Sequence, residues 1–350
     1  MKILLFSGLF LLNLLLVDAK ASGPVIKFTI DKQTFESLSA NQKNSVINSS
    51  NDLSRFINEQ ILGKIPSDIK NSLDDLKIKI VFSDKEGRDG LFIPGENNEH
   101  TIYLKLIQIQ SNGIKSLLAH EFFHAIHYHI NPDELPWVRE GLAQIYEFMT
   151  TNNLNGANLF AAITNPLTPL LGEYNVEEKN PAQYGHNQLY FLYLFNHCGR
   201  ENIFWKITKG KDGLKGSFLI DQIMSELSSD SSECKDFGES AISFLVAKHH
   251  NQIQFTAKNE IEKNKYFITS MEITPKKLIV KSELDLAKII NEMPVLSSLK
   301  MSMSDFKKYK GKCIECEIFY SNSNFPFDVL DFIPKKEDGY DLILVKTRRK

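Results

Sequence analysis

The sequence lacks the features that would place it in several large classes of protein. Its 350 residues carry 41 Lys and Arg against 43 Asp and Glu. This balance provides no basic excess of the kind that nucleic-acid-binding domains use, so we expect no nucleic-acid partner. Beyond Val17 no stretch reaches ~18 uninterrupted apolar residues, so we expect no membrane-spanning helix in the mature chain. The 42% hydrophobic content is ample for a sizeable core, and the length suggests two domains.

The one long apolar run stands at the N-terminus. Residues 3–17 read ILLFSGLFLLNLLLV after the positive Lys2, and Ala19-Lys20-Ala21 fits a small-x-small cleavage site. This order predicts a signal peptide over residues 1–21 and a secreted or periplasmic protein. The alternative is an uncleaved membrane anchor, but the run is short for a spanning helix and Asn13 interrupts it.

Cysteine is scarce, with four in the chain: Cys198, Cys234, Cys313 and Cys316. An even number in an exported chain favours disulfides, and three pairings are open. The simplest joins Cys198 to Cys234 and Cys313 to Cys316. The Cys313-Ile-Glu-Cys316 pair also has the form of a redox or zinc motif, but it lacks the second pair of a zinc ribbon.

Hydrophobic periodicity predicts an α+β protein. Strands are expected from the alternating apolar residues at 25–30, at 77–83, and on both sides of a turn within 90–109. From Ile114 to about His250 the pattern is mostly helical, and further strands are expected at 266–273, 277–282, 316–321 and 341–347. We therefore expect one domain over residues 22–250 and a smaller α+β C-terminal domain over 251–350.

Residues 118–130 read LAHEFFHAIHYHI and contain the pattern H-E-x-x-H. At ~100° per residue on a helix, His124 lies about 40° from His120 and Glu121 lies about 100° from it. Most other directions around this helix are apolar, so we expect a buried helix with one polar stripe. Buried polar groups need partners, and a metal ion is one way to supply them.

The spacing of this motif suits zinc chemistry. Two imidazoles one helical turn apart can converge on one tetrahedral zinc ion. Glu121 would then point beside the ion, within reach of a water molecule whose pKa zinc lowers toward ~7. The alternative is a pair of ordinary core histidines, so the prediction depends on a third ligand.

Two routes to a third ligand can be compared. The metzincin pattern would require a glycine at position 127 and a histidine at position 130, where this chain has His127 and Ile130. That route fails. The other route is Glu140, in a helix that we expect to begin near Pro136 after a short turn. Helices joined by a short turn are antiparallel neighbours, so Glu140 can face back toward His120; the alternative is a surface glutamate.

HEFFH followed by PWVREGLA resembles the gluzincin metallopeptidases, whose members carry W-x-x-E-G-x-A around a glutamate ligand. The resemblance covers residues 90 to about 199. It implies one Zn²⁺ per chain held by His120, His124 and Glu140, with Glu121 as general base. It also implies a zincin-like fold, with a mixed sheet over the motif helix followed by a mainly helical lobe. The edge strand of that sheet, within residues 90–104, would bind an extended peptide substrate.

Two further features of the family correspond to more than one candidate residue in this chain. Thermolysin-like members place an aspartate four residues after the glutamate ligand, where it orients a zinc histidine. This chain has Gln144 there, and either Gln144 or Glu147 is a candidate for that role. Gluzincins also use a tyrosine or histidine donor against the oxyanion, for which we favour Tyr184, with His186 as the second candidate.

Together these observations predict an exported zinc metallopeptidase, most simply an endopeptidase acting on peptides or proteins. One alternative is an aminopeptidase of the same group, although its G-x-M-E-N strand has only a faint echo in Pro94-Gly95-Glu96-Asn97. Another is an inactive zincin scaffold that binds partners. The substrate and the oligomeric state are left open by the sequence.

Overall fold

The computed structural model describes the chain over residues 15–16, 23–83, 89–106, 108, 113–165, 167–170, 180–227, 234–250, 298–302, 316–322, 325–329 and 341–346. These residues fall into two compact units. Unit 1 is drawn from Met1–Asp133 and Ala143–Leu154, and unit 2 from Glu134–Leu142 and Asn155–Lys350. Helix α5 (Pro136–Thr151) begins in unit 2 and ends in unit 1.

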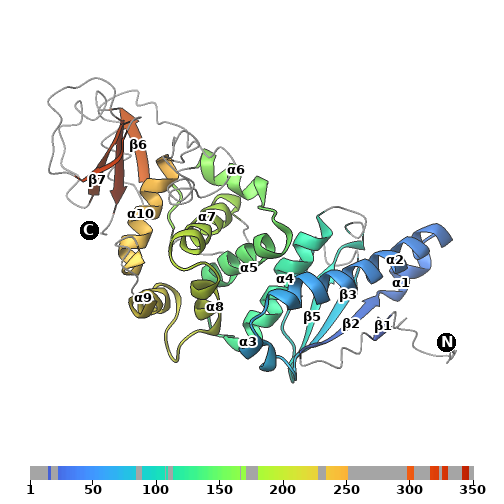
Figure 1. The fold of residues 1–350 in the computed structure, drawn as a ribbon. Coiled ribbons are helices and arrows are strands. Elements are labelled where there is room, and N and C mark those ends of the chain that lie inside the picture. Colours follow the sequence, from blue (N-terminus) through green and yellow to red (C-terminus); the bar gives the residue numbers. More distant parts are fainter. Residues whose placement is uncertain are drawn as a thin grey trace. The chain divides into compact units, whose positions relative to one another are not determined.

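Unit 1 contains a five-stranded mixed sheet in the order β1-β2-β3-β5-β4 (Figure 1). The strands are β1 (Leu15–Leu16), β2 (Val25–Ile30), β3 (Lys77–Phe82), β4 (Gly90–Ile93) and β5 (Glu99–Leu104). β2, β3 and β5 are parallel to one another, whereas β1 and β4 pair antiparallel at the two sides. Alternating β3 residues Ile78, Ile80 and Phe82 are almost fully buried, which is the pattern of a strand with one face in the core.

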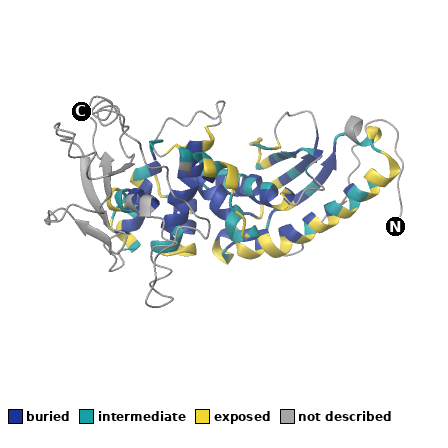
Figure 2. Cartoon of the chain, turned by 90° about the horizontal axis from the view of Figure 1, so that it is seen from above, coloured by how far each residue is buried: buried dark blue, intermediate teal, exposed yellow. Residues whose placement is uncertain are grey.

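Helices accompany this sheet in unit 1. They are α1 (Lys32–Ser37), α2 (Ala40–Phe56), α3 (Ser67–Asn71) and α4 (Ile114–Ile130), and a π-helical turn over Ile57–Ile61 and a 3-10 turn over Leu62–Lys64 follow α2. Ser39 and Gln42 form a capping box that fixes the start of α2. Its buried positions Val46, Leu53 and Phe56 lie along one side, and Figure 2 shows exposed positions on the other. This amphipathic pattern explains why α2 packs as a surface layer.

Unit 2 is mainly helical. Its helices after α5 are α6 (Gly156–Thr164), α7 (Pro181–His197), α8 (Glu201–Lys209), α9 (Gly216–Leu227) and α10 (Phe237–His250). Asn180 caps α7 through its side chain, and Pro181 occupies the first turn, where a missing N–H costs nothing. The predicted disulfide between Cys198 and Cys234 is confirmed, and its sulfurs join the C-terminal end of α7 to the segment before α10. Cys313 lies outside the described residues.

Unit 2 also contains an antiparallel sheet in the order β6-β9-β7-β8. Its strands are β6 (Ser298–Ser302), β7 (Cys316–Asn322), β8 (Phe325–Val329) and β9 (Asp341–Lys346). β7 and β9 confirm two of the strands expected in the C-terminal part of the chain, whereas β6 and β8 were not expected. The strands expected at 266–273 and 277–282 lie outside the described residues.

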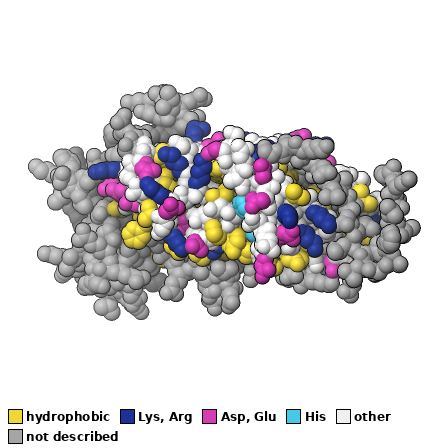
Figure 3. All heavy atoms as spheres, turned by 90° about the horizontal axis from the view of Figure 1, so that it is seen from below, with side chains coloured by type: hydrophobic (Ala, Val, Ile, Leu, Met, Phe, Trp, Pro, Cys, Tyr) yellow, Lys and Arg dark blue, Asp and Glu magenta, His cyan; other side chains and the backbone are white. Residues whose placement is uncertain are grey.

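The α+β class is confirmed, as are the strands expected at 25–30, 77–83 and within 90–109 and the helix that begins at Pro136. Most of residues 1–21 and all of 251–297 lie outside the described residues, so the signal peptide and the domain boundary near residue 250 stay predictions. Among the described helices, none is both long and apolar enough to cross a membrane. On the face drawn in Figure 3, acidic and basic side chains are interspersed over the described surface.

Candidate metal centre

Helix α4 carries the H-E-x-x-H motif and is buried on most of its circumference. Leu118, Phe122 and Ile126 are completely buried, whereas His120 and His124 are half-buried. The expected arrangement, a buried apolar helix with one polar stripe, is therefore confirmed. Burial of so many apolar side chains fixes the rotation of α4 about its axis, and this rotation determines where the histidines point.

Three side chains come together in the arrangement that a metal ion requires. His120, His124 and Glu140 each offer a ligand atom, and these atoms all lie within 4.8 Å of one another. The Nε2 atoms of the two histidines are 3.2 Å apart. Two atoms bound at ~2.05 Å to one tetrahedral ion lie about 3.3 Å apart, so this spacing fits two zinc ligands. Two neutral nitrogens and one carboxylate oxygen also form a donor set typical of catalytic zinc.

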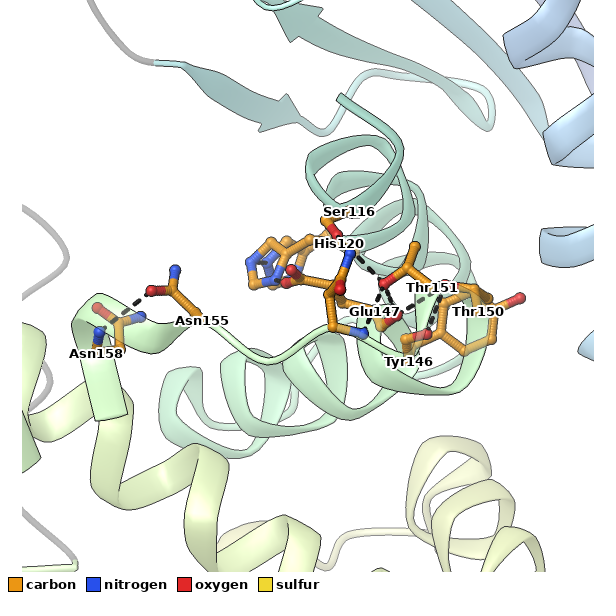
Figure 4. Close-up of polar contacts among 10 residues, drawn as sticks. Ser116, His120, Tyr146, Glu147, Thr150, Thr151, Asn155 and Asn158 are labelled. Carbon is orange, nitrogen blue, oxygen red and sulfur yellow. Dashed lines mark hydrogen bonds and ion pairs between the residues drawn. The ribbon is translucent and has the colours of Figure 1, made fainter. Parts of the chain in front are cut away.

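A second carboxylate lies behind the first histidine. Oε2 of Glu147 is 3.7 Å from Nδ1 of His120, and Figure 4 shows the two side chains pointing toward each other from α5 and α4. Nε2 of His120 therefore stays on the ligand side. The buried Oε1 of Gln144, the other candidate for this role, has no hydrogen-bond partner. The geometry thus favours Glu147 over Gln144 as the group that orients His120.

Thr151 and Ser116 adjoin this carboxylate. The Thr151 hydroxyl donates to the main-chain carbonyl of Glu147 at 2.7 Å, and the Ser116 hydroxyl donates to Oγ1 of Thr151 at 3.2 Å (Figure 4). The bond from Ser116 to Thr151 ties the first turn of α4 to the last turn of α5, and the bond from Thr151 to Glu147 lies within α5. They therefore fix the two helices against each other close to the contact between Glu147 and His120.

The general-base candidate lies under strand β4. Glu121 is only 8% exposed, and a Cβ on Gly90 would lie 2.9 Å from its Oε1 and 2.6 Å from Cδ1 of Leu117. The backbone of β4 thus passes close to the carboxylate, and a Cβ at position 90 would force the Glu121 and Leu117 side chains to shift. Two residues along, the Phe92 ring stacks on the ring of His124 with centroids 6.3 Å apart. Gly90 and Phe92 therefore face α4 together, as the period of two in a strand requires.

The remaining histidines of unit 1 have other surroundings. His127 is fully buried beside the Phe123 ring and does not belong to the ligand group. His129 donates from Nε2 to the carbonyl of Ser72 at 2.9 Å. His100 is 2% exposed and accepts from the Gly95 amide at 3.1 Å; burial, and secondarily His129, lower its pKa.

The two oxyanion candidates on α7 differ in exposure. Tyr184 is half-buried in the first turn of the helix. His186 is fully buried, and its Nε2 lies 3.3 Å from the carbonyl oxygen of Asn165. Burial, with a smaller contribution from Lys248, lowers the pKa of His186 well below its usual value. A buried imidazole held by a carbonyl is poorly suited to meet a substrate, so Tyr184 is the better candidate.

Sequence reasoning missed Phe92 and the need for Gly90. The alternation in the expected strand was sufficient to place both residues on one face, but the helix beneath that face could not be identified from the sequence. Comparisons of the chain with models of known protein families and with curated protein sequences find no significant match. The functional interpretation therefore depends on the geometry of this site and on the resemblance of HEFFH and PWVREGLA to gluzincin motifs.

Proposed function

We propose that the protein is a zinc-dependent metallopeptidase, exported from the cell, that hydrolyses internal peptide bonds. The observation that carries the proposal is the convergence of His120, His124 and Glu140 within 4.8 Å, with the Glu121 carboxylate next to the first ligand in the chain. One neutral donor pair, one anionic donor and one adjacent free carboxylate make up the minimal set for metal-assisted hydrolysis of an amide.

When bound, zinc would lower the pKa of water at the site and polarise the scissile carbonyl. Glu121 accepts the proton of the attacking water and later passes it to the leaving amine. Its burial beneath β4 keeps competing bulk water away from the carboxylate. The Glu147 carboxylate, 3.7 Å from Nδ1 of His120, favours the ring orientation that leaves Nε2 toward the ligand position.

The edge strand supports an extended substrate. Among the described strands, β4 pairs only with β5 and lies at the end of the sheet. A peptide added along the free side of β4 would obtain main-chain hydrogen bonds, and its backbone would pass close to Glu121. We assign Tyr184 as the donor that stabilises the oxyanion formed on the substrate carbonyl.

The decisive experiment combines metal analysis with hydrolysis of blocked peptides by the purified mature chain. We expect one zinc per chain, and we expect Glu121→Gln to retain the zinc and to lose hydrolysis. Glu140→Ala should lose zinc, whereas His129→Ala, on the same helix as the ligands but outside the ligand group, should retain it. A wild-type protein without stoichiometric zinc would contradict the proposal.

An endopeptidase and an aminopeptidase can be distinguished by whether the substrate must have a free N-terminal amine. An endopeptidase cleaves peptides with acetylated N-termini, whereas an aminopeptidase requires the free amine. Equal cleavage of a blocked peptide and its free-amine counterpart is the result that we expect. Zinc retained without cleavage of any peptide would instead favour the inactive binding scaffold.

A further inference from the structure

Three aromatic rings cluster beside the zinc ligand His124, and the proposed mechanism does not use them. They are Phe92, His100 and Tyr128, which we call the aromatic patch. Phe92 lies 5.6 Å from His100 and 5.8 Å from Tyr128, and His100 lies 5.4 Å from Tyr128, all between ring centroids. Each ring thus contacts the other two, at tilted or edge-to-face angles that aromatic pairs prefer.

The aromatic patch contains one buried, anchored ring and two rings that are partly accessible. His100 is buried and anchored by the Gly95 amide, which donates to its Nδ1. Phe92 and Tyr128 are both half-buried. Part of this apolar ring surface is accessible and lies next to a metal ligand. Such a surface is typical of a ligand-binding site.

The aromatic patch lies further along the contact between β4 and α4 than Gly90 does. Gly90 lies at Leu117 and Glu121, and Phe92 lies at His124 and Tyr128, so β4 advances in the same direction as α4. The side chains of Leu91 and Ile93 point to the opposite face, where Ile93 is 40% exposed.

A peptide paired with β4 would place its side chains in the same register. Directly opposite residues of neighbouring strands project to the same face, so the substrate residue beside Phe92 would project toward α4 and the patch. The next residue on that face would lie beside Gly90, above Glu121. The residue beside Phe92 is therefore close to the bond that is cut.

We propose that the aromatic patch makes this enzyme selective for a large apolar side chain, aromatic or long aliphatic, at the substrate residue that lies beside Phe92. The inference rests on the proposed peptidase function and names its substrate class. A charged side chain there would lose hydration against the rings of Phe92 and Tyr128.

Cleavage of a peptide library provides the first test. The library consists of internally quenched peptides, blocked at both ends, in which one position at a time is varied. We expect one subsite next to the scissile bond to prefer Phe, Tyr, Leu or Met over Ala, Asp and Lys by about 10- to 100-fold in kcat/KM, as one apolar subsite can achieve. A preference for small or charged residues at both neighbouring subsites would overturn the proposal.

Variants then assign the preference to the patch. Phe92→Ala should reduce the discrimination between Phe and Ala substrates at that subsite at least tenfold, with zinc stoichiometry unchanged. Phe92→Leu, which keeps an apolar surface, should retain most of it, and this variant remains informative if the alanine variant does not fold. Ile93→Ala, on the other face of the same strand, is the matched control and should leave the preference unchanged. Equal discrimination in Phe92→Ala and the wild type would overturn the assignment.

Binding to the Glu121→Gln variant separates this inference from the proposed function. Calorimetry with blocked peptides that carry Phe or Asp at the selected position measures recognition without turnover. A wild-type protein that holds zinc and cleaves nothing, while Glu121→Gln still binds the Phe peptide at least tenfold more tightly, would refute the peptidase function and support the patch. Hydrolysis without any side-chain preference would support the function and refute the patch.

Discussion

Glu147 shows that a single side chain can lie where the resemblance to another group of proteins would place a different residue. In the resemblance to thermolysin-like enzymes, the carboxylate that orients a zinc histidine stands four residues after the glutamate ligand, where this chain has Gln144. The structure instead places Glu147, one helical turn later, 3.7 Å from Nδ1 of His120. Residues at these two positions share a helix face, so the role can move by a turn.

The two candidates for this role, Gln144 and Glu147, should differ in their effect on zinc affinity. Glu147→Gln removes the negative charge 3.7 Å from Nδ1 of His120, and we expect zinc affinity to fall about 10- to 100-fold. Gln144→Met should leave zinc affinity unchanged, because the buried Oε1 that it removes has no hydrogen-bond partner. Competition with a fluorescent chelator measures both dissociation constants. The opposite order of effects would return the role to Gln144.

Gly90 is the residue on which the position of the general base depends. Alanine there would force its Cβ to within 2.9 Å of the Glu121 carboxylate, so the strand or the carboxylate must move. We expect Gly90→Ala to keep its zinc and to lose about 10- to 100-fold in kcat, since small displacements of reacting groups are costly. Gly63→Ala is the control, because its Cβ would meet no atom closer than 3.8 Å. Unchanged kcat in Gly90→Ala would show that β4 does not constrain the base.

At the scale of whole elements, the first half of α5 packs against α7 within unit 2. The side chain of Trp137 packs on Phe191 of α7 with ring centroids 5.7 Å apart. One turn later, a Cβ on Gly141 would lie 2.1 Å from Cδ2 of Phe191. The two helices can therefore approach this closely only because residue 141 is glycine, and Glu140 is held in place beside it.

Gly141→Ala tests this helix contact. Alanine normally stabilises a helix by about 1 kcal/mol relative to glycine, but overpacking against Phe191 costs about 1–3 kcal/mol. We expect a net loss in the free energy of unfolding, measured in urea, and weaker zinc binding because Glu140 shifts. Gly156→Ala, at the start of α6, has open space around its Cβ and should cause neither effect. A stabilised Gly141→Ala protein would mean that α7 can shift to accommodate the added methyl group without loss of stability.

Elements and ligands differ in how far the sequence alone predicts them. The helical pattern of residues 114–130 and the H-E-x-x-H spacing predicted α4 and two members of the group that could hold a metal ion, because both properties are local to one helix. Gln144 and Glu147 could not be ranked, since one turn of helix separates them and only packing against α4 decides. Phe92 was missed for the same reason, as its partner His124 is far away in sequence.

At the scale of the whole molecule, the hydrophobic periodicity predicted the α+β class, but it did not indicate where charges are buried. Lys248 on α10 is 1% exposed, and burial lowers its pKa to about 7. His186 on α7 is also buried, and the pKa of its ring is lowered further by Lys248. Two basic groups buried in one unit connect the stability of the fold to pH.

The direction of this dependence follows from proton counting. Between pH 7 and pH 10.5 the unfolded chain binds a proton at Lys248 that the folded chain does not, so the free energy of unfolding rises with pH in this window. The slope for one group is at most about 1.4 kcal/mol per pH unit. The contribution from His186 has the same sign, because its folded pKa lies below its usual value, and it appears at more acidic pH.

Lys248→Met should therefore stabilise the protein at pH 7.5 and lose this advantage progressively toward pH 9.5. The exposed Lys235 provides the control, and we expect the difference between Lys235→Met and the wild type to be independent of pH. Urea unfolding at a series of pH values gives both differences, and taking differences removes the pH dependence of zinc binding that all three proteins share. Parallel stability curves for the wild type and Lys248→Met would show that the Lys248 ammonium stays charged in the folded protein. Its burial would then be compensated by a partner rather than by loss of its proton.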